Sequence, residues 1–338
     1  MVSPQRCFII AEAGVNHGGS VDLAQKLIEA AAAAGADAVK FQTFRAESLV
    51  SPNAPRAEYQ TRNLGEGDQL SMLRALELPA DAYPALYRRC AELGVEFMST
   101  PFDAASAAML VRLGMRRIKV ASGEITNLPL LRDLAALGRP LILSTGMSTL
   151  EEVGEAIRAM KLTPGMLTLL HCTSNYPADP EEVNLHAMAT MRDAFALPVG
   201  YSDHTLGTAV SIAAVALGAV VIEKHFTLDR SAPGPDHKAS LEPGDLARMI
   251  REIRAIERAL GDGVKAPAPS EIAVREVARR SVTLLRAVRA GETLAAADLA
   301  LRRPATGIAP RDLEQVVGRR AARALDSGAV LRWEDLQP

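Results

Sequence analysis

Short apolar runs alternate with longer amphipathic segments along the first 226 residues of the chain. Each run is rich in Val, Ile, Leu or Phe, and the segment after it repeats apolar residues with the period of an α-helix. The runs predict eight strands, at residues 8–14, 38–43, 95–100, 117–122, 141–146, 167–172, 198–203 and 220–226. The other segments predict helices at residues 21–34, 84–93, 104–113, 128–136, 150–160, 184–195, 207–217 and 243–260.

Several predicted helices end at a glycine that leads directly into the next strand, as at Gly35, Gly94, Gly114 and Gly218. Glycine commonly closes helices because it adopts the left-handed conformation at low cost. Strands that are apolar at nearly every position are buried on both faces, which is typical of a parallel sheet with crossover helices. Eight such units in about 250 residues favour a closed (β/α)8 TIM barrel, an α/β fold.

An open, doubly wound parallel sheet is the competing arrangement. That fold calls for a GxGxxG turn after the first strand. The sequence at residues 13–19, AGVNHGG, does not have this spacing. The barrel is therefore the favoured fold.

The composition changes to Gly, Pro, Lys and Ala at residue 261, and the periodicity ends there. We predict a barrel domain at residues 1–260, a linker at 261–279 and a second domain at 280–338. The second domain has strand-like pieces at 281–285 and 330–333 between Gly and Pro turns, which indicates a β-rich fold. A domain of about 60 residues buries only a small core, so we expect it to pack against another surface.

Composition narrows the classes of partner. The chain has 338 residues, 38 Lys and Arg against 40 Asp and Glu, and a formal charge of −2, so no charge imbalance favours nucleic acid or an anionic membrane. Three scattered cysteines are too few for a disulfide framework or a zinc ribbon. No apolar run reaches the ~20 residues of a membrane span and no signal peptide is evident, so a soluble, cytoplasmic protein is expected.

Polar side chains gather where the predicted strands end, which is where the chemistry of such barrels is found. One group combines two ammonium groups with several hydroxyls: Lys40, Lys119, Ser122, Ser144 and Ser202. This set of donors suits a phosphate monoester, whose oxygens accept many charge-assisted hydrogen bonds. The alternative is that each lysine pairs with a neighbouring carboxylate at the barrel rim.

A second group could hold a metal. His204 and His225 end adjacent predicted strands, and Glu223 and Asp236 lie nearby in the sequence. Two imidazoles with oxygen or water neighbours suit Mn, Fe, Co or Zn, which would polarise a carbonyl as a Lewis acid. Taken singly, each histidine is more often a hydrogen-bonded core residue.

Two carboxylates at strand ends, Glu12 and Glu124, are placed for proton transfer or for binding sugar hydroxyls. A salt bridge to Lys40 or Lys119 is the alternative for each of them. Cys172 has no evident activating partner and is expected to be buried.

Several motifs together resemble the sialic acid synthase family, which includes N-acetylneuraminate synthases and N,N'-diacetyllegionaminate synthases. They are IAEAGVNHGG at residues 10–19, AVKFQ at 38–42, KVASGE at 119–124, YSDHT at 201–205 and IEKHFT at 222–227. The tail, with RRPATGI at 302–308, resembles the antifreeze-like (SAF, β-clip) domain that follows the barrel in this family.

The resemblance implies a transferase that condenses phosphoenolpyruvate with an N-acyl hexosamine and water, giving a nine-carbon 2-keto acid and phosphate. It implies that His204 and His225 hold a divalent metal, Mn²⁺ in the first place, with Mg²⁺ or Co²⁺ as alternatives. The implied phosphoenolpyruvate ligands are Lys40, Lys119, Ser122, Ser144, Ser174 and Ser202. The implied sugar ligands are Glu12, Tyr176, Asp236 and Arg303, and the implied catalytic carboxylates are Glu12, Glu124 and Glu223.

Family members are domain-swapped homodimers, so the resemblance implies that Arg303 reaches the barrel of the partner subunit. Ser174 departs from the family pattern, because N-acetylneuraminate synthases carry Asn at that position. The sequence GPDHKASLEP at residues 234–243 resembles both neuraminate and diacetyllegionaminate synthases. N-acetylmannosamine is the first expectation for the acceptor, and a 2,4-diacetamido-2,4,6-trideoxymannose is the alternative.

Two further hypotheses compete with this activity. A Schiff-base aldolase or lyase on the same barrel would use the amine of Lys119 or Lys224. The tail alone would suggest a non-catalytic protein that binds carbohydrate or ice. That hypothesis does not explain why polar residues gather at the strand ends of the barrel.

Overall fold

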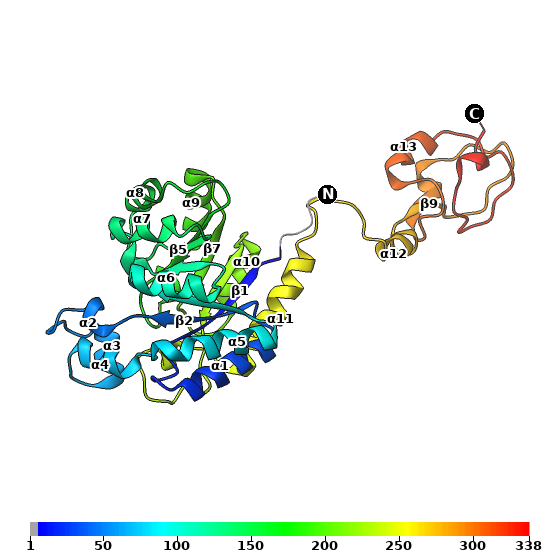
Figure 1. The fold of residues 1–338 in the computed structure, drawn as a ribbon. Coiled ribbons are helices and arrows are strands. Elements are labelled where there is room, and N and C mark those ends of the chain that lie inside the picture. The colour runs from blue at the N-terminus through cyan, green and yellow to red at the C-terminus, as the bar shows by residue number, and fades with distance from the viewer. Residues whose placement is uncertain (1–5, 338) are drawn as a thin grey trace. The chain divides into compact units, whose positions relative to one another are not determined.

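The computed structural model describes residues 6–337, and the chain divides into two compact units, Met1–Asp262 and Gly263–Pro338 (Figure 1). No helix among these residues combines the length and the apolar character that a membrane crossing requires.

The first unit is built on eight parallel strands that follow one another around a barrel. They are β1 (Phe8–Gly14), β2 (Ala38–Thr43), β3 (Glu96–Pro101), β4 (Ile118–Val120), β5 (Leu141–Ser144), β6 (Leu167–Cys172), β7 (Val199–Asp203) and β8 (Val221–His225). The strand order is β3-β2-β1-β8-β7-β6-β5-β4, so the first strand pairs with the last. β3 and β4 lie side by side, but no hydrogen-bonded ladder joins them within residues 6–337. The barrel prediction is confirmed, because a doubly wound sheet would not join β1 to β8.

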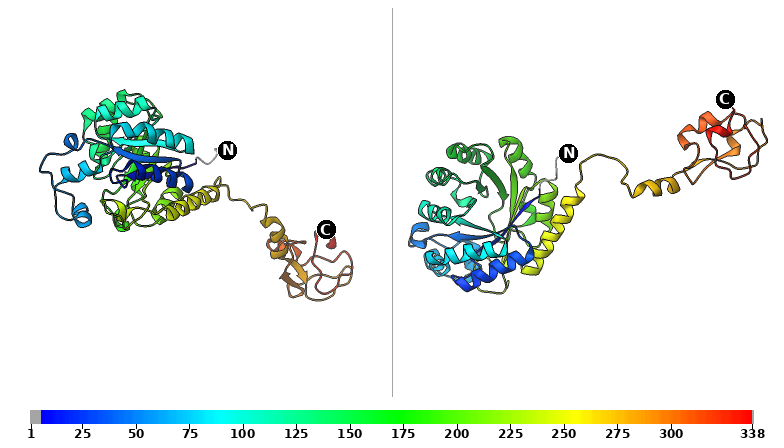
Figure 2. Two further views of the ribbon diagram at one scale, coloured as in Figure 1. Left: turned by 60° about the horizontal axis from the view of Figure 1, so that its bottom comes forward. Right: turned by 45° about the vertical axis from the view of Figure 1, so that its right-hand side comes forward.

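Helices surround the strands on the outside, as the two views of Figure 2 show. The crossover helices are α1 (Val21–Ala34), α5 (Tyr83–Leu93), α6 (Ala104–Leu113), α7 (Leu128–Ala136), α8 (Leu150–Met160), α9 (Ala187–Phe195), α10 (Ala209–Ala216) and α11 (Pro243–Ala259). Local sequence fixes their ends. Ser20 accepts a hydrogen bond from the Leu23 N–H at the start of α1, and Gly35 ends this helix in the left-handed conformation.

The main core lies between the outer face of the strands and the helices. A smaller apolar cluster fills the interior of the barrel and consists of Ile10, Ala38, Met98, Ile142, Leu170 and Val221. These residues point inward because side chains alternate between the two faces of a strand. The barrel is therefore plugged by apolar side chains below the carboxyl ends of its strands.

The segment between β2 and β3 contains three short helices that the sequence pattern did not predict. They are α2 (Ala46–Leu49), α3 (Glu58–Leu64) and α4 (Gln69–Leu76). Helices of four to eight residues contain too few turns to show a helical period. They are held by a satellite cluster in which Val15, Phe44, Met72 and Leu76 are buried.

The second unit has a small antiparallel sheet of β9 (Ser281–Leu284) and β10 (Leu299–Arg302) and a short helix α13 (Leu313–Val316). Its core includes Val282, Leu294 and Leu331. The strand predicted at 330–333 is wrong, because Val330 makes only an isolated bridge to Thr283 and a 3-10 turn, Trp333–Asp335, follows. The stretch predicted as a linker contains a helix, α12 (Glu271–Ala278).

Candidate active site

Inward-facing side chains of the barrel change from apolar to polar just before the strands end. In β1, Ile10 belongs to the interior apolar cluster, and Glu12, two residues later, lines a cavity. β2 repeats this order with Ala38 and Lys40. The cavity measures about 300 Å³. It brings together most of the site residues predicted from sequence: Glu12, Lys40, Lys119, Ser122, Ser144, Ser174, Tyr176, Ser202, His204, Glu223 and His225.

Two lysines and two glutamates form the floor of the cavity. Lys40 Nζ lies 2.8 Å from Glu12 Oε1 and 3.7 Å from Glu223 Oε2, and it also donates to Thr100 Oγ1 at 2.9 Å. Lys119 Nζ lies 3.5 Å from Glu223 Oε1. All four side chains are buried. The lysines thus pair with carboxylates, as the alternative interpretation expected, but the pairs lie inside the cavity and leave Glu12 Oε2 and Glu223 Oε2 without hydrogen-bond partners among the described residues.

The surroundings shift the pKa values of the two glutamates in opposite directions. Burial opposes the charge of Glu223, but the ammonium groups of Lys119 and Lys40 outweigh it and lower the pKa of Glu223 to about 2. Burial raises the pKa of Glu12 to about 7, although Lys40 opposes this rise. Glu223 is therefore a fixed anion, whereas Glu12 can give or take a proton near neutral pH.

Serine hydroxyls line one side of the cavity. Ser144 is buried, and its Oγ has no hydrogen-bond partner in the described part of the chain, so it is available to a ligand. Ser122 Oγ accepts a hydrogen bond from the Gly146 N–H at 2.9 Å. A Cβ on Gly146 would lie 2.2 Å from Ser174 Oγ, so the backbone at this glycine packs directly against the cavity wall.

The imidazoles of His204 and His225 lie next to each other, with ring centroids 5.5 Å apart and planes inclined by 57°. His204 Nδ1 lies 2.7 Å from the Thr173 carbonyl oxygen, so it carries the proton and leaves Nε2 as the acceptor, with only the Ser202 hydroxyl near it, at 3.5 Å. His225 Nδ1 has no hydrogen-bond partner among residues 6–337. Burial lowers the pKa of both rings, to about 4 for His204, which keeps them neutral as a metal ligand requires.

The two imidazoles fit a divalent metal, but they supply only part of the ligands that such an ion needs. Within residues 6–337 no group of three or more His, Cys, Asp or Glu side chains is arranged to hold an ion. The nearest carboxylate is Asp236, whose Oδ2 lies 3.8 Å from His225 Nδ1. The other ligand positions would have to come from water or substrate oxygens, which is common at catalytic metal sites.

Tyr176 covers the two imidazoles. Its ring centroid lies 4.2 Å from that of His204 and 5.5 Å from that of His225. Tyr59 packs against Tyr176, with ring centroids 5.0 Å apart. Tyr176 and Asp236, both predicted sugar ligands, therefore lie beside the histidine pair.

Three predicted site residues do not line the cavity: Asp236, which lies beside His225, and also Glu124 and Arg303. Glu124 lies in a 3-10 turn, Ser122–Glu124, and its Oε2 accepts a hydrogen bond from Asn127 Nδ2 at 2.7 Å near the start of α7. The turn directs Glu124 away from the cavity floor. Arg303 follows β10 in the second unit.

Sequence reasoning missed the wall formed by Ala57, Tyr59, Phe102 and Met147. Ala57 and Tyr59 come from the start of α3, in the segment with no predicted elements. Phe102 and Met147 follow β3 and β5, at strand ends where an apolar residue cannot be told from a core residue by its pattern alone. Aromatic residues make up only 4% of the chain, so an aromatic residue outside the predicted strands and helices, such as Tyr59 or Phe102, was a possible site candidate.

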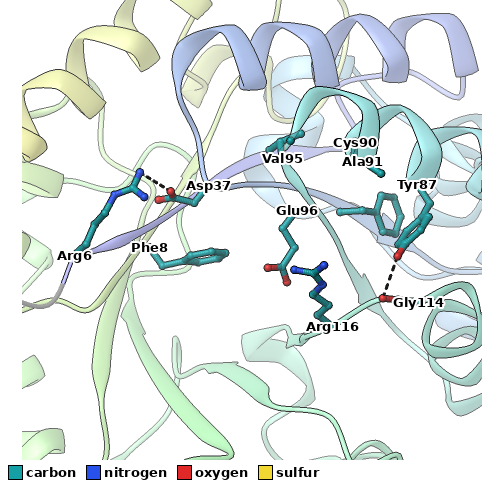
Figure 3. A pocket seen from close by; sticks show the side chains of 12 residues that line it. Arg6, Phe8, Asp37, Tyr87, Cys90, Ala91, Val95, Glu96, Gly114 and Arg116 are labelled. Atoms are coloured by element: carbon teal, nitrogen blue, oxygen red, sulfur yellow. Dashed lines mark hydrogen bonds and ion pairs between the residues drawn. The ribbon is translucent and has the colours of Figure 1, made fainter.

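A larger cavity, of about 460 Å³, lies at the opposite end of the barrel, where β1 and β3 begin (Figure 3). Its acidic groups are paired within the chain: Asp37 lies 2.7 Å from Arg6, and Glu96 bonds Arg117. Chemistry in (β/α)8 barrels takes place at the carboxyl ends of the strands, and residues at the amino ends serve stability. We therefore assign the active site to the smaller cavity.

The fold and this cavity define the class of the protein as a barrel enzyme whose working groups stand at its strand ends. The NeuB family model matches residues 27–265, and the SAF domain model matches residues 279–337. The chain belongs to the NeuB family, which confirms both the resemblance carried by its motifs and the antifreeze-like domain after the barrel.

Named relatives agree over nearly the whole chain. The N,N'-diacetyllegionaminic acid synthase of Legionella pneumophila is 50% identical, over 99% of this chain and 96% of its own. The enzyme of the same name from Campylobacter jejuni is 46% identical, over 97% and 99%. Among solved structures, the N-acetylneuraminic acid (sialic acid) synthetase of Leptospira borgpetersenii is 35% identical with a TM-score of 0.73, covering 80% of this chain and 90% of that one.

Proposed function

We propose that the protein condenses phosphoenolpyruvate with 2,4-diacetamido-2,4,6-trideoxymannose and water, giving N,N'-diacetyllegionaminate and phosphate. The observation that carries this activity is the joining, in one cavity, of a lysine and serine cradle with a pair of neutral imidazoles. The relatives with 50% and 46% identity favour this acceptor over N-acetylmannosamine, which was the first expectation from the motifs.

The shape of the cavity supports an acceptor with apolar groups. Its floor is charged, whereas Ala57, Tyr59, Phe102 and Met147 give one wall an apolar character. Met147 is 74% exposed and Ala57 is exposed, so this wall lies toward solvent, where an acceptor would enter. A 6-deoxy sugar with two acetamido methyl groups would bury apolar surface there, which N-acetylmannosamine has less of.

Phosphoenolpyruvate would bind where the donors converge. Lys119, Ser122, Ser144, Ser174 and Ser202 all line the cavity, and Lys40 lies on its floor. Ser144 offers a buried hydroxyl without a partner in the described part of the chain, and Lys119 is held only loosely by Glu223, at 3.5 Å. An anion can therefore take bonds from these groups without breaking a short ion pair.

His204 and His225 would hold the metal, with Mn²⁺ as the proposed ion. Bound there, a divalent ion supplies a Lewis acid for the aldehyde oxygen of the open-chain acceptor. The chain's own residues do the rest: the cradle holds phosphoenolpyruvate with its C3 toward the aldehyde carbon. A new C3–C1 bond forms from the enol π electrons, and positive charge develops at C2.

Glu223 and Glu12 then divide the remaining work. Glu223, a fixed anion, faces the positive charge at C2 and accepts a hydrogen bond from the water that adds there, while the proton that this water loses leaves with the phosphate. Glu12, with its pKa of about 7, protonates the oxygen of the former aldehyde. The tetrahedral carbon finally releases phosphate by breaking its C–O bond, which leaves the 2-keto acid.

The protein is proposed to work as a domain-swapped homodimer in which the SAF unit caps the partner's cavity and Arg303 contacts the acceptor. The match of the SAF domain model to residues 279–337 supports this part of the proposal. Phosphoenolpyruvate and the acceptor are the only partners proposed, with no nucleic acid and no membrane.

The test is phosphate release from phosphoenolpyruvate with Mn²⁺ and either 2,4-diacetamido-2,4,6-trideoxymannose or N-acetylmannosamine. We expect kcat/KM to be at least tenfold higher with the diacetamido sugar. Equal values, or a preference for N-acetylmannosamine, would contradict the proposed acceptor and leave the condensation itself in place. Absence of phosphate release with either sugar, together with trapping of pyruvate on a lysine by borohydride, would favour the Schiff-base alternative.

Only one of the two lysines suggested for the Schiff-base alternative lines the active-site cavity. Lys224 does not line the cavity, is fully buried, and lies 2.9 Å from Asp203. A nucleophilic amine must reach the substrate carbon, so only Lys119 of the two suggested residues has access.

A further inference from the structure

Asp203 and Lys224 form an ion pair on the outer side of the barrel wall. Lys224 lies between Glu223 and His225, which both face the cavity, so alternation along β8 directs Lys224 toward the surrounding helices. Lys224 Nζ lies 2.9 Å from Asp203 Oδ2, and both side chains are 0% exposed. The pair therefore stands directly behind the active site without touching substrate.

The same two side chains bind the backbone that follows β7. Lys224 Nζ donates to the Thr205 carbonyl oxygen at 2.5 Å. Asp203 Oδ1 accepts from the Thr205 N–H at 2.8 Å and from Thr205 Oγ1 at 2.7 Å. Ser211 of α10 donates to Asp203 Oδ2 at 2.6 Å. His204 is the residue enclosed by this network, because Asp203 precedes it and Thr205 follows it.

The network also fixes the neighbouring strand. Asp203 of β7 and Lys224 of β8 are register partners, and the next residue along the chain is His204, just after β7, and His225, the last residue of β8. The ion pair therefore joins the two strands one residue below the two imidazoles. Any slip between β7 and β8 would change the separation of the rings, now 5.5 Å between centroids.

Stability alone gives little reason for such a pair. A buried ion pair is often no better for stability than well-packed apolar residues of similar volume, because the charges lose their hydration. Its value lies in the single geometry that it imposes, since each charge here has several directed hydrogen bonds. That geometry is imposed next to the two residues whose separation matters for holding one ion.

We propose that the Asp203–Lys224 pair is a positioning element that sets the distance between His204 and His225 and thereby the affinity for a divalent metal. The inference rests on the proposed function, because the metal role of the two histidines belongs to that proposal. Outer partners that orient metal ligands commonly contribute 10- to 100-fold to metal affinity.

The test is the affinity of Lys224→Met for Mn²⁺, measured from the electron paramagnetic resonance signal of free Mn²⁺ without substrates. We expect the dissociation constant to rise about 10- to 100-fold relative to the unaltered protein. Ser211→Ala, which removes one hydrogen bond to the same carboxylate, should give a smaller rise in the same direction. It also serves as the second variant if Lys224→Met does not fold.

The matched control is Asp37→Asn. Asp37 pairs with Arg254 at 2.7 Å at the opposite, amino-terminal end of the barrel, and it lies outside the active-site cavity. This variant should lower thermal stability, followed by circular dichroism in metal-free buffer, while its affinity for Mn²⁺ stays within about twofold of the original.

Three outcomes would overturn the inference, and they differ in what else they affect. Unchanged Mn²⁺ affinity in Lys224→Met and Ser211→Ala, with normal binding by the unaltered protein, removes the inference alone. Equal weakening in Asp37→Asn does the same, because it makes the effect one of general destabilisation. Absence of Mn²⁺ binding by the unaltered protein removes the inference together with the metal assignment.

Discussion

Lys40 Nζ lies 2.8 Å from Glu12 Oε1 at the floor of the barrel, with both side chains buried. This contact holds one oxygen of Glu12, while the other oxygen has no hydrogen-bond partner among the described residues. A carboxyl fixed in this way, with its pKa raised to about 7 by burial against the opposing charge of Lys40, is suited to exchange a proton at neutral pH.

Glu12→Gln should therefore impair the chemical step. Glutamine keeps an oxygen for Lys40 and fills nearly the same volume, but it cannot transfer a proton. We expect kcat to fall about 10²- to 10⁴-fold, with the KM for both substrates changed only a few-fold. Steady-state phosphate release measures both quantities.

Glu124→Gln is the matched comparison for this prediction. The sequence suggested a catalytic role for Glu124, whereas the structure directs this side chain to Asn127 and away from the cavity. We expect its kcat to stay within about twofold of the unaltered protein. A loss in Glu124→Gln as large as in Glu12→Gln would show that the turn moves when substrate binds.

The sequence predicted the barrel closely because strand burial and helix period are local signals. β1, β2 and β6 have the predicted bounds. β4 is shorter than predicted, ending at Val120, because the chain enters a 3-10 turn at Ser122. The polar residues of that stretch belong to a turn, which a pattern of apolar positions does not separate from a strand end.

The cavity was predictable where the strands themselves supply its lining. Glu12, Lys40 and Glu223 follow from counting inward positions toward the carboxyl end of a strand. Tyr59 was not predictable in this way, because it is brought to the cavity by α3, whose place depends on packing around Phe44 and Met72. Non-local packing of that kind leaves no period in the sequence.

If His204 and His225 together hold a divalent metal, activity should depend on that metal and on both side chains. Chelation of divalent ions should abolish turnover, and His225→Ala should lower kcat/KM by about 10²-fold or more, since it removes half of the protein ligands. His186→Ala is the control, because His186 lies at the start of α9 and outside the cavity. Full activity of His225→Ala in metal-free buffer would contradict the assignment.

The position of Gly146 allows a test of the serine hydroxyls that are proposed to bind phosphoenolpyruvate. A Cβ at this position would lie 2.2 Å from Ser174 Oγ, 2.8 Å from Cys172 Sγ and 3.0 Å from Ser122 Oγ, so Gly146→Ala must displace them. We expect at least a tenfold rise in the KM for phosphoenolpyruvate and a loss of about 1–3 kcal/mol in the free energy of unfolding.

Gly123→Ala tests whether that effect is specific to Gly146. Gly123 lines the cavity, but a Cβ there would meet no heavy atom within 4 Å. Its KM for phosphoenolpyruvate should stay within about threefold of the original. Similar kinetics for the two alanine variants would mean that Ser122 and Ser174 do not hold the substrate.

The proposed domain swap predicts complementation between two inactive variants. If Arg303 acts on the partner's cavity, His225→Ala and Arg303→Ala each carry one intact half of a complete site. Subunits mixed after reversible dissociation should regain up to about a quarter of the original activity, because half of the random dimers then have one complete site. Activity that stays at the level of the separate variants would show that Arg303 acts within its own chain or not at all.

His17 provides a prediction about stability and pH that is independent of catalysis. Its ring is 1% exposed and packs near Phe41, and its Nε2 has no hydrogen-bond partner among residues 6–337. Burial lowers the pKa of His17 from 6.5 to about 4. Between these values the unfolded chain takes up a proton at this residue that the folded chain does not bind.

The barrel should therefore lose stability as the pH falls from about 6.5 to about 4, since protonation then favours the unfolded state. The contribution of His17 amounts to roughly 3 kcal/mol over this range. His17→Asn keeps an acceptor for the Gly19 N–H but removes the titrating group. The free energy of unfolding of the variant, minus that of the original protein, should therefore differ by roughly 3 kcal/mol between pH 7 and pH 4. His186→Asn is the control. Urea unfolding should be followed by circular dichroism, because the single tryptophan, Trp333, reports on the second unit. A difference that is the same at both pH values would mean that the folded barrel protonates His17 as readily as the unfolded chain does.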